Sequence, residues 1–202
     1  CLQSISLPKA KTIDRDLVRG LVTVFDNASG NAQQLPVMLR TRGQSSLQYP
    51  KAGYLMKFID QQTGGETSAS LLGLSENTEY TLNSLYEDNT KIRDFASLSL
   101  WSSIRNTGRD TVHAYTIDFV YAEVFINGAY AGLYGFQENV NLASFGLANA
   151  KSISLFMPDS HRVPSLKTAP VSGEVWDDIQ LEETTQETPW ALLKEAVDQM
   201  FY

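Results

Sequence analysis

Two arginines, a glycine and two serines precede an apolar, strand-like run, and this mixture of residues suits the binding of an anion. The stretch covers 40–58 and reads RTRGQSSLQYPKAGYLMKF. A turn containing Gly43 and Ser46 can expose backbone N–H groups to an anion. Lys57 alternates with apolar neighbours in the following strand, so it points to the opposite face from them. A phosphate site and a surface hairpin with solvated charges are the two interpretations of this stretch.

The composition is that of a globular chain with an acidic surface. Its 202 residues are 43% hydrophobic and 19% charged, with a formal net charge of −7 and a pI near 4.8. A length of this order supports one good core or two small ones. The acidic balance argues against a nucleic-acid partner, because nucleic-acid phosphates are usually met by a net basic surface. A phosphate site must therefore be a local basic pocket on an acidic body.

Cysteine usage and hydropathy give few clues to the compartment. The single cysteine is Cys1, so neither an intrachain disulfide nor a cysteine-based zinc site is expected. A terminal cysteine is compatible with a lipoprotein anchor and equally with a boundary of the expressed chain. No apolar run approaches the length of a membrane span, and we recognise no signal peptide. We assign no metal-ligand set, since His113 and His161 lack partners at ligand spacing.

Apolar periodicity and turn residues predict an α+β fold in which an antiparallel sheet is packed by helices. Asn127-Gly128 is the strongest local pattern, because both residues tolerate the positive φ of a tight hairpin turn. The expected strands are Leu17–Phe25, Leu35–Arg42, Tyr54–Asp60, Glu79–Ser84, Tyr115–Ile126 and Ala129–Gln137. An amphipathic helix is expected over Ile92–Ile104, capped by the polar residues before it. Arg93 in its first turn opposes the helix dipole, so it should have a partner such as Glu138 or a ligand.

Two stretches of the chain resemble the CotH family, the spore-coat-protein-H-like atypical protein kinases. The first is Arg42-Gly43-Gln44-Ser45-Ser46 with Pro50-Lys51 and the strand Tyr54–Phe58. The second is Tyr121–Val140, in which an Asn-Gly hairpin ends near Glu138. With the helix of Arg93 between them, the resemblance spans about residues 35–142. Ala52 departs from the pattern, because many relatives have a second lysine there.

The resemblance implies a protein-kinase-like small lobe over residues 1–142. A loop-rich connection and the beginning of a second, helical lobe are expected over 143–202. The family's metal-binding Trp-Asp-x-Asp segment is not matched by Val175–Asp178, whose two aspartates are adjacent. The chain is therefore interpreted as a fragment of a kinase or as a relative without the catalytic half.

The function implied by this resemblance is transfer of the ATP γ-phosphoryl group, with Mg, to serine or threonine of a coat or cell-surface protein. That activity implies an extracytoplasmic location, at the cell surface or spore coat. The residues expected at the nucleotide and its phosphates are Arg42, Ser45, Ser46, Lys57, Arg93 and Glu138. Catalytic residues are not assigned, so enzymatic activity of this chain is left open.

Two other functions are compatible with the same residues. One is a non-catalytic surface or structural module in which the basic pocket binds another anion or braces the sheet. The other is a carbohydrate-binding β-domain, since aromatic faces suit sugars. Its candidate residues are Tyr121, Tyr130, Tyr134 and Trp176.

Overall fold

The structure is a computed structural model, and it divides the chain into two compact units, Cys1–Phe145 and Gly146–Tyr202. The residues that it describes are 2–6, 15–27, 29–43, 45–104, 116–147, 149–151, 153–158, 179–185, 187–191 and 193–195. Among the residues named above, Cys1, Gln44, His113, Tyr115, His161, Trp176 and the rest of Val175–Asp178 lie outside these ranges, as does the side chain of Ser45.

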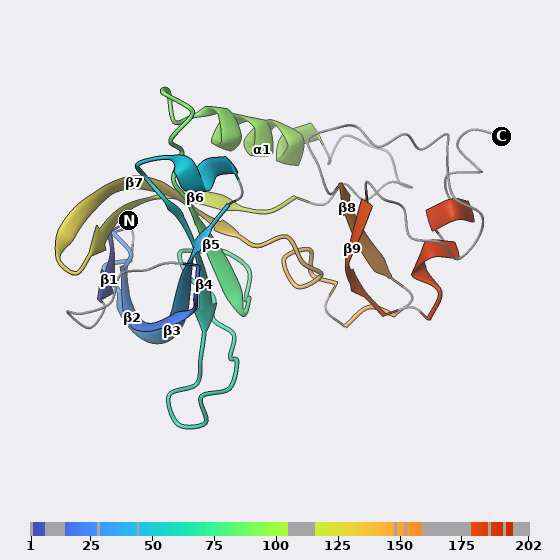
Figure 1. The fold of residues 1–202 in the computed structure, drawn as a ribbon, viewed down its shortest axis with the longest axis horizontal. Helices are drawn as coiled ribbons and strands as arrows, with labels where there is room; N and C mark the ends of the chain where they lie inside the picture. Colours follow the sequence, from blue (N-terminus) through green and yellow to red (C-terminus); the bar gives the residue numbers. More distant parts are fainter. Residues whose placement is uncertain are drawn as a thin grey trace. The chain divides into compact units, whose positions relative to one another are not determined.

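The first unit is a curled sheet that closes on itself (Figure 1), and most of it is β-structure. The strand order is β1-β2-β3-β4-β5-β7-β6; β1 pairs with β6 in parallel, and the other pairs are antiparallel. Its elements are β1 Leu2–Ser6, β2 Val18–Phe25, β3 Ala32–Arg42, the 3₁₀ helix η1 Ser45–Gln48, β4 Gly53–Phe58, β5 Glu79–Asn83, α1 Arg93–Ile104, β6 Phe119–Ile126 and β7 Ala129–Glu138.

The barrel interior is filled by apolar side chains that alternate along each strand with outward-facing residues. Tyr80 stacks on Phe136, with ring centroids 4.9 Å apart, and meets Phe58 edge-on. The fully buried residues of this core include Val22, Val37, Leu39, Met56, Phe58, Tyr80, Leu82, Val124, Tyr134 and Phe136. Tyr134, one of the aromatic residues considered for a sugar-binding surface, is therefore part of the core.

Helix α1 lies beside β6 (Figure 1), but it does not bury an apolar face as its periodicity predicts. Phe95 on its inner side contacts the rings of Phe119 and Tyr121. None of its residues is fully buried, and Leu100 on the other side is 61% exposed. The prediction of a sheet with packed helices is therefore confirmed for the antiparallel sheet and only loosely supported for the helices.

A long excursion between β4 and β5 extends away from the barrel (Figure 1). Asp60 closes its turn, because one carboxylate oxygen accepts the backbone N–H groups of Gln62 and Thr63. The turn reaches Gly64 and Gly65 before the chain comes back to pair at Glu66 with Ile59.

The second unit contains a two-stranded sheet of β8 Ser154–Pro158 and β9 Ile179–Thr184. Residues 189–191 and 193–195 are helical. Ile179 is buried there, with Phe156, Trp190 and Leu193 packed against it. The proline-rich composition of this region predicts loops, so the strand pair is a feature that the sequence pattern does not indicate.

Gly135 is required by close packing on the outer side of β7. A Cβ atom at this position would lie 2.2 Å from the ring of Phe119. We expect Gly135→Ala to lower the unfolding free energy by about 1–3 kcal/mol, because the ring would have to leave its place between β6 and α1. Urea unfolding measures the change.

The matched control is Gly65→Ala in the exposed turn, where the nearest atom would be Thr63 Oγ1 at 3.4 Å. That variant is expected to change stability by less than about 0.5 kcal/mol. Equal effects of the two substitutions would contradict the packing argument.

Candidate functional site

The turn after β3 is built tightly enough to need its glycine. Gly43 has a φ of +129°, and a Cβ atom there would lie 2.0 Å from the Ser46 hydroxyl oxygen. Ser46 in η1 therefore packs directly against the glycine backbone. This close packing explains why a glycine at 43 and a serine at 46 occur together in the Arg-Gly-x-Ser-Ser pattern.

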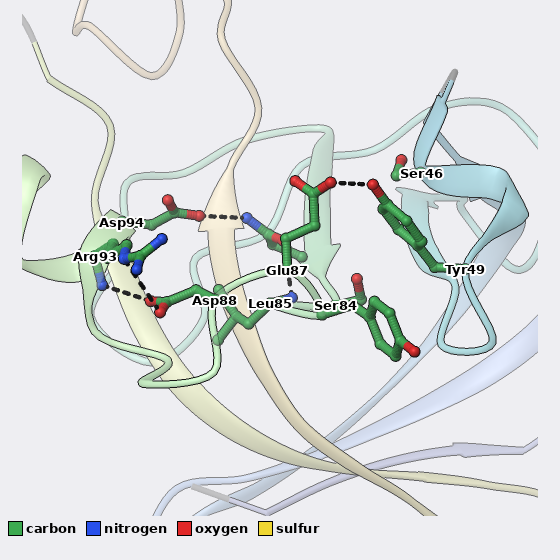
Figure 2. A pocket seen from close by; sticks show the side chains of 10 residues that line it. Ser46, Tyr49, Ser84, Leu85, Glu87, Asp88, Arg93 and Asp94 are labelled. Atoms are coloured by element: carbon green, nitrogen blue, oxygen red, sulfur yellow. Dashed lines mark hydrogen bonds and ion pairs between the residues drawn. The ribbon is translucent and has the colours of Figure 1, made fainter.

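A pocket of about 310 Å³ lies between this turn, the end of β5 and the start of α1 (Figure 2). The turn contributes Ser46 and Tyr49, and α1 contributes Arg93 and Asp94. The complete lining is Ser46, Tyr49, Asn83, Ser84, Leu85, Tyr86, Glu87, Asp88, Arg93 and Asp94. Three carboxylates and one arginine make this pocket acidic, in contrast to the basic pocket that we expected.

Asp88 organises the wall of the pocket at the start of α1. One oxygen of its carboxylate accepts the backbone N–H of Arg93 at 2.8 Å, and the other accepts both N–H and O–H of Thr90. The Arg93 side chain lies 3.6 Å from the same carboxylate. The Thr90 hydroxyl and these other donors lower the pKa of Asp88 to about 2. Asp88, rather than Glu138, is thus the partner of Arg93.

Hydrogen bonds also join the other walls of the pocket. Asn83 at the end of β5 donates to Asp94 at 2.9 Å, so the strand is tied to the first turn of α1. The Tyr49 hydroxyl donates to Glu87, and the Tyr49 ring stacks on Tyr86 with centroids 5.1 Å apart. Figure 2 shows the hydrogen bond between Tyr49 and Glu87 at the pocket, with Asp94 on the other side. The pocket is therefore a connected structure formed from three segments of the chain.

Lys51 anchors the loop that carries Ser46 and Tyr49. Its ammonium donates to the backbone carbonyl of Ser84 at 2.8 Å and to that of Leu133, and it lies 4.1 Å from the centre of the Tyr134 ring. Burial, with repulsion from Lys91, lowers the pKa of Lys51 to about 8. The lysine of the Pro50-Lys51 pair is therefore a strut that joins the turn, the end of β5 and β7.

The outward side of β5 connects the pocket with Lys57. Tyr80 and Leu82 point into the core, so Glu79, Thr81 and Asn83 face outward in a row. At one end of this row Glu79 pairs with Lys57 at 3.3 Å. Glu66 lies 3.6 Å from the same ammonium. Partial burial lowers the pKa of Lys57, but the two glutamates outweigh it and the net pKa is raised.

Two arginines of β3 lie across the sheet from this row. Arg40 pairs in the ladder with Leu55, which in turn pairs with Thr81. Arg42 is exposed as a residue, yet burial of its guanidinium and repulsion from Arg40 lower its pKa, while Glu79 acts in the opposite direction. Arg40 and Arg42 are two residues apart on β3, so they share the outer face of the sheet with Glu79.

Glu138 points into the barrel instead of toward this face. It is 1% exposed, and its two carboxylate oxygens accept the backbone N–H groups of Ser75 at 2.6 Å and Asp118 at 3.1 Å. It therefore holds the loop before β5 and the start of β6 in place. We make no ligand proposal for Glu138.

The structure brings together some of the residues expected from the sequence. Ser46 and Arg93 line one pocket, and Arg42 ends the strand that leads into its turn. Lys57 lies at the other end of β5, beside two glutamates. Sequence reasoning did not single out Thr81 or Tyr49. Asp88 is one of the polar residues that we expected to cap the helix, and its carboxylate does accept the backbone N–H of Arg93. The pairing of Tyr49 with Glu87 is visible only in the folded structure.

Comparison with protein families gives one match, to the family model described as CotH kinase protein, over residues 39–200. The chain belongs to the CotH kinase family. The match begins within β3 and extends beyond β9, so it includes the pocket, the outward row of β5 and most of the second unit. The resemblance predicted from the two sequence stretches is thereby confirmed. A search of curated proteins returned no match.

Removal of the Asp88 charge tests the wall of the pocket. The carboxyl group ionises near pH 2 in the folded chain and near pH 4 in an unfolded one, so its contribution to stability is complete above about pH 4 and is lost as the pH falls toward 2. We expect Asp88→Asn to lower the melting temperature at pH 7 and to differ less from the wild type at pH 2. Glu123→Gln, on the exposed side of β6, controls for net charge. A difference that stays constant with pH would contradict the assignment.

The strut formed by Lys51 predicts a second pH dependence, at high pH. Its amine loses a proton near pH 8 when folded and near pH 10.5 when unfolded, so the folded state gains stability as the pH rises through this interval. We expect the melting temperature of Lys51→Met, relative to the wild type, to fall between pH 8 and 10. If the two melting curves shift in parallel over this range, the ammonium is not buried as described.

Proposed function

We propose that this CotH-family chain carries the nucleotide-binding part of a protein kinase. The reaction is transfer of the γ-phosphoryl group of ATP to serine or threonine of a coat or cell-surface protein. The observation that supports it most is the pair Arg40 and Arg42, two like charges that lie on the same face of β3 just before the Ser46 turn. Repulsion between like charges is relieved when an anion binds between them.

The order of elements supports the same proposal. A strand that carries Lys57 is followed by β5, then by α1, and then by the β6–β7 hairpin, which leads into a loop at Asn139. This is the order that we expect for a protein-kinase-like small lobe. The fold of a domain does not fix its function, so the proposal depends on the side chains of the outer face.

These side chains fit the phosphates of a nucleotide on the β3 side of the turn. The planar fork of Arg42 can donate two hydrogen bonds to one phosphate, and Arg40 can do the same. The Ser46 hydroxyl lies at the adjoining wall of the pocket. The carboxylates of Glu87 and Asp94 repel phosphate, so we place the phosphates between Ser46 and the arginines, outside the acidic part of the pocket.

The fit is different for magnesium. Among the described residues, no group of three His, Cys, Asp or Glu could hold a metal ion. Mg²⁺ is often bound by one or two carboxylates together with substrate phosphates, so a site of that kind would need the nucleotide to complete it. We therefore derive no step through a metal.

No helix in the described part of the chain is long and apolar enough to span a membrane. A location at the coat or cell surface is part of the proposal.

A non-catalytic module of the same family is the second candidate. It is favoured by the neutralisation of Lys57 by Glu66 and Glu79, and by the acidity of the pocket. In this case the chain would bind a nucleotide or another anion without transferring a phosphoryl group. Binding and transfer must therefore be measured separately.

The test is isothermal titration of the protein with Mg-ATP, together with an assay for transfer of radiolabelled phosphate to serine-rich proteins. We expect Arg42→Ala to weaken ATP binding by about tenfold or more, because it removes a charge-assisted contact worth at least about 1.4 kcal/mol.

The matched control for Arg42→Ala is Arg19→Ala, an exposed arginine on β2 in the same barrel, which should bind within about twofold of the wild type. Binding without transfer would favour the non-catalytic module. If the wild-type chain neither binds ATP nor transfers phosphate, the kinase proposal is wrong.

A further inference from the structure

Thr81 carries a buried hydroxyl oxygen that has no hydrogen-bond partner. It is the only such side-chain atom found in the described part of the chain, and the residue is 1% exposed. Burying a hydroxyl without a partner is unfavourable, because water no longer solvates it. Valine has nearly the same shape and suits a strand at least as well. An unpaired hydroxyl at this position therefore needs a physical explanation.

The location of Thr81 in the sheet offers an explanation for its unpaired hydroxyl. It lies in the middle of the outward row of β5, between Glu79 and Asn83. In the ladder it is opposite Leu55 of β4 on one side and Gln137 of β7 on the other. The ladder continues from Gln137 to Phe119 of β6. A hydroxyl and a carboxamide thus lie side by side between two apolar side chains.

This combination suits a flat heterocycle better than it suits phosphate. The faces of a nucleobase are apolar, while its edge carries hydrogen-bond donors and acceptors. Small-molecule sites are typically apolar with a few polar groups that fix orientation. Arg42 and the Ser46 turn lie beyond the level of Thr81, toward the end of β3, while Arg40 lies level with Thr81 two strands away. The position of Thr81 on β5 is therefore left for the uncharged part of a nucleotide.

We propose that the Thr81 hydroxyl, with the Gln137 carboxamide beside it, hydrogen-bonds to the base of the bound nucleotide. The inference rests on the proposed nucleotide-binding function and adds the residues that contact the base. Thr81 is covered in the structure, so a base reaches it only after nearby side chains move. Arg42 is suited to this movement, because it is an exposed residue at the end of β3, on the same face of the sheet as Thr81.

Thr81→Val tests the proposal, because it should change binding and stability in opposite directions. The substitution removes the unpaired hydroxyl, so the free protein should melt at the same temperature as the wild type or higher. The same protein should bind ATP about tenfold more weakly, because the base loses a hydrogen bond. Inorganic triphosphate, which lacks a base, should bind the wild type and the variant equally.

Two further variants control the interpretation. Thr81→Ser keeps the hydroxyl and should bind ATP within about threefold of the wild type. Thr23→Val removes a strand hydroxyl that does have a partner, since it accepts a hydrogen bond from Gln34 at 3.3 Å. It should not raise the melting temperature, and its ATP binding should be unchanged. Gln137→Leu tests the second proposed contact with the base. It should weaken the binding of ATP without affecting the binding of inorganic triphosphate.

The possible failures are distinguishable. If the wild type binds ATP and Thr81→Val binds it equally well, the contact with the base is wrong while the nucleotide site stands. A clearly lower melting temperature for Thr81→Val would show that the hydroxyl has a structural partner, which also overturns the inference. If the wild type binds no nucleotide, both the inference and the proposed function fail.

Discussion

The interior of the barrel is filled by side chains, and this constraint decides where a ligand can bind. Tyr80, Phe58 and Phe136 contact one another at the centre, so no space remains inside for a nucleotide. Any ligand must therefore bind on the outward side of the sheet or at an end of the barrel. Strand β5 contributes to the core and to the outer surface. Its inward residues complete the core, and its outward residues lead to the pocket at Asn83.

The polar groups at the two ends of the barrel have complementary roles. At one end, Lys51 holds the Ser46 turn against the carbonyls of Ser84 and Leu133, which fixes a wall of the pocket. At the other end, Glu138 accepts backbone N–H groups from two loops. The loop after β7 is held by buried hydrogen bonds among Asn77, Asn141 and Ser144. A rigid scaffold of this kind is what positions residues of a binding face with little rearrangement.

Local chemistry made part of this fold predictable from the sequence. Asn127 and Gly128 both adopt the positive φ that a tight hairpin needs, at 52° and 81°. The alternation around Lys57 correctly placed that residue on the outer face of β4. The sequence alone could not identify the partner of Arg93, because Asp88 and Glu138 both lie next to turns. Only the folded structure shows that Asp88 contacts Arg93, whereas Glu138 binds backbone N–H groups elsewhere. Whether the Thr81 hydroxyl has a hydrogen-bond partner depends on the residues that cover it. A single sequence does not show which residues these are.

The excursion between β4 and β5 has a practical consequence for work on this protein. Its turn is closed by its own hydrogen bonds through Asp60, and its tip at Gly64 has no atom near enough to meet an added Cβ. A fluorophore or a short epitope attached there would report rotation and diffusion of the barrel while leaving the pocket walls unmodified. The tip thus provides an attachment point for single-molecule or anisotropy work, on a segment that contributes no residue to the pocket lining.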